Sequence, residues 1–190
     1  MAIERSFVFV RPPHSLNEGR AVEIIGYLDG LLARESFTRS KDICPLQPPR
    51  ELLEKHYAHC KNLPFFADMI RNYSQAILPV VYLGEDICQR IFDAVGATDP
   101  SGEEEWKLRR RFSLAPKGKD YGVKSFYGYC DSLQHAKEEG RAVENVLHRS
   151  GYHFKTKSWE KIWEAEQEIA LWAEFLKSYE VDIPELAEAA

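Results

Sequence analysis

Hydrophobic and polar positions follow two different periods along the chain. The runs SFVFV (6–10) and PVVYLG (79–84) are continuously apolar, which is typical of strands buried on both faces of a sheet. Apolar residues recur at helical spacing over 19–33 and again over 85–95, where Gly96 supplies a helix stop. The pattern therefore predicts two strands, each followed by a helix.

The remaining segments extend this alternation. Prolines before residue 50 and at residue 64 permit helix starts, and the stretch 97–124 is polar and irregular in pattern. We expect a second strand at 36–45, helices at 48–60, 64–73 and 132–148, and a fourth strand at SFYGYC (125–130). Strands alternating with helices in this way predict an α/β (α+β sandwich) fold, with a ferredoxin-like four-stranded antiparallel sheet and covering helices.

The C-terminal part has a different character. We expect a core domain over 1–150 and a C-terminal amphipathic helical extension over 151–190. The predicted helix at 157–179 carries three of the four tryptophans on its apolar face. Such a face either docks on its own domain or forms an interface with another subunit, since aromatic residues are enriched at interfaces.

Composition limits the function classes. The 190 residues carry 25 Lys and Arg against 30 Asp and Glu, a net charge of −5, and no apolar run reaches 18 residues. We expect a cytoplasmic protein with no membrane and no nucleic-acid partner. The four cysteines form no C-x-x-C pair and are expected to be reduced thiols. His56, His59 and Cys60 share a helix face but lack a fourth ligand, so no metal site is predicted.

Over residues 4–147 the order of short phrases resembles the nucleoside diphosphate kinase family. The phrases are ERSFVFVRP, HY at 56–57, LPFF at 63–66, PVVYLGED, VGATDP at 95–100, LRRRF at 108–112 and YGYCDS. In that family a histidine accepts the γ-phosphate of a nucleoside triphosphate and passes it to a diphosphate. The resemblance implies the ferredoxin-like fold, a homo-oligomer, and Mg²⁺ bound with the nucleotide.

The resemblance also implies roles for individual residues. Phe65 matches the aromatic residue that stacks on the base, and Tyr57 matches the tyrosine that supports a phosphate-binding lysine. Thr98 and Arg109 match phosphate ligands, the arginine being suited to bidentate contacts. Glu139 matches the glutamate that orients the catalytic histidine.

Several positions depart from the family pattern. Arg11 stands in place of the lysine, and Phe92 in place of a second phosphate-binding arginine. Lys124 replaces an asparagine that contacts ribose and phosphate. Tyr127 takes the nucleophile position, and a tyrosine of pKa near 10 is ionised in only about one molecule in a thousand at pH 7.

These departures predict a divergent pseudoenzyme that binds a nucleotide such as ATP, or another phosphorylated small molecule, and lacks phosphohistidine transfer. A first alternative is an active or repurposed phosphotransferase with rearranged catalytic residues, in which His14 after the first strand could serve as nucleophile. A second alternative is an interaction domain with a vestigial cleft.

Overall fold

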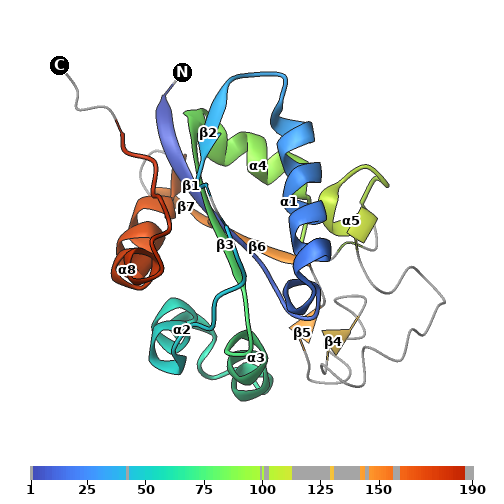
Figure 1. The fold of residues 1–190 in the computed structure, drawn as a ribbon, viewed down its shortest axis with the longest axis vertical. Coiled ribbons are helices and arrows are strands. Elements are labelled where there is room, and N and C mark those ends of the chain that lie inside the picture. The colour runs from blue at the N-terminus through green and yellow to red at the C-terminus, as the bar shows by residue number, and fades with distance from the viewer. Residues whose placement is uncertain are drawn as a thin grey trace.

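The computed structural model describes residues 2–41, 43–98, 100, 103–112, 129–130, 142–143, 146–155 and 159–186. Its centre is a four-stranded antiparallel sheet (Figure 1). In chain order the strands are β1 (Ile3–Val10), β2 (Phe37–Arg39), β3 (Leu78–Glu85) and β6 (Leu147–Arg149). They lie in the order β2-β3-β1-β6, so the first strand is central and pairs with the fourth and the third. The ferredoxin-like sheet expected from the sequence is confirmed.

The expected position of the fourth strand is wrong. Tyr129–Cys130 does form a short strand, β4, but it pairs in parallel with β5 (Ala142–Val143) in a separate two-stranded sheet. The fourth strand of the main sheet is β6, which begins at the last two residues of the helix expected at 132–148. Valine and leucine four residues apart fit a helical stripe, yet β-branched residues also favour strands, and pairing with β1 decides the outcome here.

Helices cover both faces of the sheet (Figure 1). One core cluster joins Val8, Val10 and Leu147 to helices α1 (Glu18–Leu32), α4 (Ile87–Val95) and α5 (Leu108–Phe112). The second cluster joins Phe7 and Phe9 on the other face to α2 (Arg50–His56), α3 (Phe66–Tyr73) and α8 (Ala165–Ser178). Two 3-10 helices, η1 (His14–Leu16) and η2 (Ala58–Cys60), also lie within the described residues. Within the described residues, no helix combines the length and the apolar character that crossing a membrane requires.

The segment after β6 is not one long helix. A hairpin of β7 (Tyr152–Lys155) and β8 (Glu160–Trp163) precedes α8, so the helix expected from residue 157 begins only at Ala165. Tyr152 and Trp163 pack edge to face across the hairpin. These two aromatic residues therefore stabilise a pair of strands and not the face of a helix. Helix α8 packs on β1 and buries Trp172 completely. Whether residues 151–190 form a separate unit stays a prediction.

Candidate functional site

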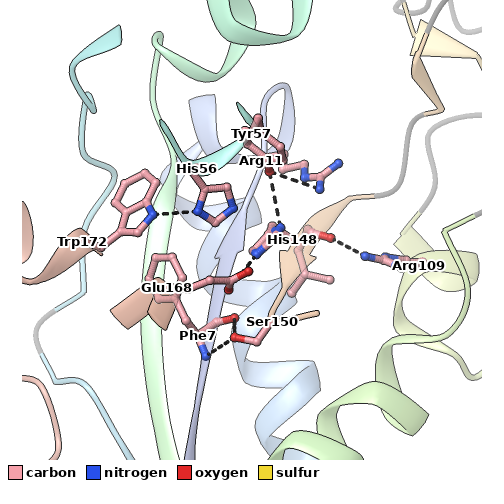
Figure 2. Close-up of polar contacts among 10 residues, drawn as sticks. Phe7, Arg11, His56, Tyr57, Arg109, His148, Ser150, Glu168 and Trp172 are labelled. Carbon is pink, nitrogen blue, oxygen red and sulfur yellow. Dashed lines mark hydrogen bonds and ion pairs between the residues drawn. The ribbon is translucent and has the colours of Figure 1, made fainter. Parts of the chain in front are cut away.

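The site is built around His148 at the middle of β6 (Figure 2). Its ring stacks on Phe9 of β1, with centroids 4.6 Å apart and planes inclined by 16°. The side chain is only 11% exposed. The neighbouring strand and the helices α2 and α8 therefore hold the imidazole in one orientation.

The two ring nitrogens of His148 have different partners. Nε2 lies 3.2 Å from a carboxylate oxygen of Glu168 on α8, and Nδ1 lies 3.4 Å from the hydroxyl of Tyr57 (Figure 2). A carboxylate only accepts hydrogen bonds, so it fixes the ring proton on Nε2. Nδ1 then carries the lone pair, which is the form of imidazole that can act as a nucleophile.

Several groups act on the carboxylate of Glu168, the acid partner of His148. Burial raises the pKa of Glu168, while the nearby His56, the Ser150 hydroxyl and the Gly151 backbone act in the opposite direction and favour the carboxylate. Ser150 also accepts a hydrogen bond from the backbone N–H of Phe7 at 2.9 Å and donates one to its carbonyl at 3.0 Å. These bonds tie the end of β6 to β1, which fixes the backbone next to His148.

The environment of His148 keeps it uncharged. Burial lowers the pKa of His148 well below its ordinary value, and the positive charges of Arg11, Arg109 and Arg149 lower it further. The imidazole is therefore neutral at pH 7. A neutral imidazole flanked by arginines is suited to attack an electrophile that carries negative charge.

Two of these arginines also make defined contacts around the histidine, one with the backbone and one with side chains. Arg109 on α5 is buried and donates from its two outer nitrogens to the carbonyls of Gly96 and Leu147, each at 3.0 Å. It thereby connects the end of α4 to β6. Arg11, directly after β1, directs its guanidinium to the Tyr57 hydroxyl at 3.5 Å and lies over the Tyr73 ring at 5.1 Å.

A second histidine lies beside the first. The indole N–H of Trp172 donates to Nδ1 of His56 at 2.9 Å, and the rings of His56 and His148 meet edge to face with centroids 4.6 Å apart (Figure 2). Burial is the main reason that the pKa of His56 falls to about 3, so this ring is neutral. Because the indole can only donate, the proton of neutral His56 resides on Nε2.

The tautomer of His56 bears on whether the cluster around it can bind a metal ion. His56, His148 and Glu168 each bring one potential ligand atom within 4.8 Å of the other two. A histidine ligand needs a free lone pair toward the metal and normally donates its other N–H to an outer partner. His56 has the reverse arrangement, since Nδ1 accepts from Trp172 and Nε2 carries the proton. The cluster therefore fits a hydrogen-bonding network better than a metal site.

The contact between Trp172 and His56 leads to a stability prediction. Trp172→Phe keeps most of the buried ring but removes the N–H donor, which leaves His56 Nδ1 without a partner. We expect the free energy of unfolding to fall by about 1–2 kcal/mol, measured by urea denaturation followed by circular dichroism. Trp159→Phe is the matched control, because Trp159 is 82% exposed. Equal effects of the two substitutions would contradict a specific role of this hydrogen bond.

The structure brings together three of the residues that the sequence assigned to the site. Arg11, Tyr57 and Arg109 all converge on His148. Phe65 caps α3 and packs against the second core cluster, and Thr98 is exposed two residues beyond Gly96. His14, the alternative nucleophile, is buried in η1. Lys124, Tyr127 and Glu139 lie outside the described residues, so their assigned roles stay predictions.

Sequence reasoning missed His148, Ser150 and Glu168. The family pattern of a histidine with a serine and an orienting glutamate was placed on residues 127–139, because 125–130 resembled the fourth strand. A usable signal was present in NVLHRS (145–150), an apolar run that ends in a histidine and is followed by a serine two positions later. Its three-residue strand was too short to stand out against the helical spacing of the residues before it.

Comparisons of the sequence with known proteins point to one family. A model of the nucleoside diphosphate kinase family matches residues 4–172, a range that includes His148 and Glu168. A nucleoside diphosphate kinase of Dehalococcoides mccartyi (strain BAV1) is 30% identical over 138 residues, covering 72% of this chain and 89% of that protein. One of Clostridium perfringens is 27% identical over 140 residues, covering 73% of this chain and 90% of that protein.

Solved structures show the same fold. The nucleoside diphosphate kinase of Borrelia burgdorferi, a transition-state mimic with bound vanadate and ADP, superposes with a TM-score of 0.64 at 17% identity, covering 98% of this chain and 94% of that one. The enzyme of Halobacterium salinarum in complex with CDP gives a TM-score of 0.56 at 20% identity, covering 98% and 95%. The fold and the sequence matches together show that the chain belongs to the nucleoside diphosphate kinase family.

Proposed function

We propose that this protein is an active nucleoside diphosphate kinase in which His148 carries the phosphoryl group. The observation that carries the proposal is the pair of contacts made by His148. Glu168 fixes the proton on Nε2, and Nδ1 points to the part of the site where Tyr57 and Arg11 lie. A neutral, oriented imidazole beside cationic groups has the chemistry that phosphoryl transfer to histidine needs.

The reaction would proceed in two phosphoryl transfers, first to His148 and then to the acceptor diphosphate. The lone pair of His148 Nδ1 attacks the γ-phosphorus of a nucleoside triphosphate, and the bond from that phosphorus to the β,γ-bridging oxygen breaks. The diphosphate leaves with the bonding electron pair, and the ring retains its Nε2 proton, so positive charge develops on it. The carboxylate of Glu168 stabilises that charge. A terminal oxygen of a second diphosphate then attacks the phosphohistidine and restores neutral His148.

The cationic groups around the histidine support a phosphate ligand. The guanidinium groups of Arg11, Arg109 and Arg149 all lie near enough to depress the pKa of His148. Such a concentration of positive charge is stabilised when an anion binds among it. Thr98 near the end of α4 would add a hydroxyl to the phosphates, and Phe65 would cover the base, as the resemblance implies. The vanadate and ADP in the similar Borrelia structure are consistent with this class of ligand.

We expect magnesium to enter with the nucleotide. The carboxylate beside His148, Glu168, is largely buried and is engaged by the histidine, so it is poorly placed to bind a cation. Mg²⁺ commonly keeps several waters and binds through substrate phosphates. Its contribution here would be to neutralise phosphate charge, while orientation and nucleophilicity come from the chain.

One alternative remains specific enough to test against this proposal, namely a protein that binds nucleotides without transferring phosphate. This alternative follows if the nucleophile position is occupied by Tyr127, as the sequence resemblance implies, and not by His148. A homo-oligomer and a cytoplasmic location stay predictions from the sequence.

The proposal is tested by incubating the purified protein with γ-labelled ATP and Mg²⁺. We expect a phosphoprotein that is stable in base and labile in acid, that loses its label when a nucleoside diphosphate is added, and that maps to His148 by mass spectrometry under neutral conditions. Absence of a label in protein that binds ADP would favour nucleotide binding without transfer. A label on any other residue would contradict the assignment of His148.

A further inference from the structure

The hairpin of β7 and β8 connects the two halves of the candidate site. It follows β6, which carries His148, and a single residue separates it from α8, which carries Glu168. At its base the carbonyl of Gly151 accepts a hydrogen bond from the backbone N–H of Glu164 at 3.2 Å. The position of the hairpin therefore sets where α8 begins.

One lysine of this hairpin is enclosed by aromatic rings. The Nζ of Lys161 lies 4.2 Å from the ring centroids of both Phe92 and Tyr152, and 4.4 Å from the centroid of Trp163. The ring of Phe92 packs edge to face with the other two, at centroid distances of 5.1 and 5.8 Å. Nζ also donates a hydrogen bond to Oε1 of Gln89 at 2.8 Å. An ammonium group over an aromatic face is attracted by the negative charge of the ring face, more strongly where water is partly excluded.

These contacts join the hairpin to α4. Tyr152, Lys161 and Trp163 belong to the two strands of the hairpin, whereas Gln89 and Phe92 belong to α4. Buried apolar residues of the first core cluster fix α4 on the sheet. The five residues, which we call the lysine clamp, therefore attach the hairpin to a helix that is itself firmly packed.

The first turn of α8 runs from the clamp side of the sheet to the side of His148. Ala165 belongs to the same core cluster as α4, whereas Ile169 belongs to the cluster on the other face. Glu168 lies between these two positions, and its carboxylate reaches Nε2 of His148 at 3.2 Å (Figure 2). A change in where α8 begins would move this carboxylate relative to the imidazole.

We infer that Lys161 is a positioning residue for phosphoryl transfer at His148. Its ammonium group holds the hairpin on α4, the hairpin sets the start of α8, and the first turn of α8 keeps Glu168 against the imidazole. Lys161 does not touch the substrate in this role. The inference rests on the proposed function, because it assigns a residue to the reaction of His148. A misplacement of about 1 Å can lower a rate by about a hundredfold, so a contact outside the site can influence the chemistry.

The test uses Lys161→Met, which keeps an unbranched side chain between the rings and removes the charge and the N–H donors. We expect phosphohistidine formation from γ-labelled ATP and Mg²⁺, measured in a single turnover, to slow about tenfold. The dissociation constant for ADP should stay within about twofold of the parent, because the groups that bind phosphate are unchanged. Lys161→Arg keeps a cation over the rings and should restore the rate to within about threefold of the parent.

A spectroscopic measurement separates positioning from a general loss of stability. Heteronuclear NMR of the histidine rings reports which ring nitrogen carries the proton, and the signal of His148 is identified by its absence in His148→Gln. In the parent this proton should reside on Nε2, facing Glu168. In Lys161→Met part of the population should shift to the Nδ1 tautomer as that contact loosens. Thermal melting confirms that each variant is folded at the temperature of the measurement.

Lys155→Met is the matched control, because Lys155 lies on the other strand of the same hairpin and pairs with Glu160 at the surface. Gln89→Met provides a second route, since it removes the hydrogen-bond acceptor on α4. It should also slow labelling, and its effect should not add to that of Lys161→Met in the double variant. A rate for Lys161→Met within about twofold of the parent, an equal loss in Lys155→Met, or additive effects in the double variant would overturn the inference.

The outcomes separate this inference from the proposed function. A parent that forms phosphohistidine no faster than Lys161→Met would refute the role of Lys161 alone. A parent that binds ADP but forms no phosphohistidine would refute phosphotransfer, and the tautomer of His148 would then decide on the clamp. A shift to Nδ1 in Lys161→Met would uphold the positioning of Glu168, and an unchanged tautomer would refute it.

Discussion

Replacing His148 with glutamine should reduce phosphorylation of the protein by γ-labelled ATP by at least about a thousandfold, because the substitution removes the attacking nitrogen. Glutamine is similar in size and can still hydrogen-bond to Glu168 and Tyr57, the two partners of the imidazole. The fold and the affinity for ADP should therefore be retained. The measurement is acid-labile label per protein chain after a short incubation with Mg²⁺ and ATP.

Tyr127→Phe is the control that separates the two candidate nucleophiles. Removing the phenolic hydroxyl should leave the rate of labelling within about twofold of the parent. If Tyr127→Phe abolishes labelling while His148→Gln keeps it, the nucleophile lies at residue 127 and the proposed mechanism is wrong. Far-ultraviolet circular dichroism and ADP titration of both variants distinguish a loss of chemistry from a loss of fold.

The parts of the fold that the sequence predicted well are those with long, regular patterns. The runs at 6–10 and 79–84 became β1 and β3, and the helical stripe over 85–95 became α4, which stops at Gly96. Gly96 has φ of 84°, a left-handed conformation that favours glycine, so the stop signal had a local physical cause. These elements supply most of the sheet and one covering layer.

The parts that the sequence predicted poorly are short or depend on distant partners. Strand β6 has three residues, and its identity is set by pairing with β1 from the other end of the chain. The helix α5, five residues long, lies in a segment that looked irregular because arginines fill its middle. Buried Arg109 donates hydrogen bonds to two backbone carbonyls, and no local pattern in the sequence indicates this role.

The candidate site divides in the same way. Arg11 and Tyr57 were found because the phrases ERSFVFVRP and HY resemble the family, and the structure places both beside His148. The histidine was missed because one error in strand placement shifted the expected nucleophile to residue 127. Glu168 was hidden as well, since 20 residues and a hairpin separate it from His148. Only the packing of α8 on β1 brings the two side chains together.

Two buried neutral histidines should make the protein sensitive to acid. The pKa of His56 is about 3 and that of His148 lies well below 6.5, whereas both return to about 6.5 in the unfolded chain. Below pH 6.5 the unfolded state therefore binds more protons than the native state. Between pH 6.5 and pH 5, His56 should then remove about 2 kcal/mol from the free energy of unfolding, and His148 should act in the same direction. The stabilisation is fully present above pH 6.5 and is lost as the pH falls.

Glu168 offsets part of this loss, because its raised pKa means that the native state takes up a proton more readily than the unfolded chain does. We expect a net decrease of about 2–4 kcal/mol between pH 7 and pH 5, measured by urea denaturation at several pH values. His56→Gln should reduce the slope of stability against pH, since glutamine can accept the Trp172 hydrogen bond without titrating. His153→Gln is the matched control, because His153 is half exposed and pairs with Glu164 on the hairpin side. A flat profile in the parent, or equal slopes in the parent and His56→Gln, would show that these rings are not buried in the neutral form on which the nucleophilicity of His148 depends.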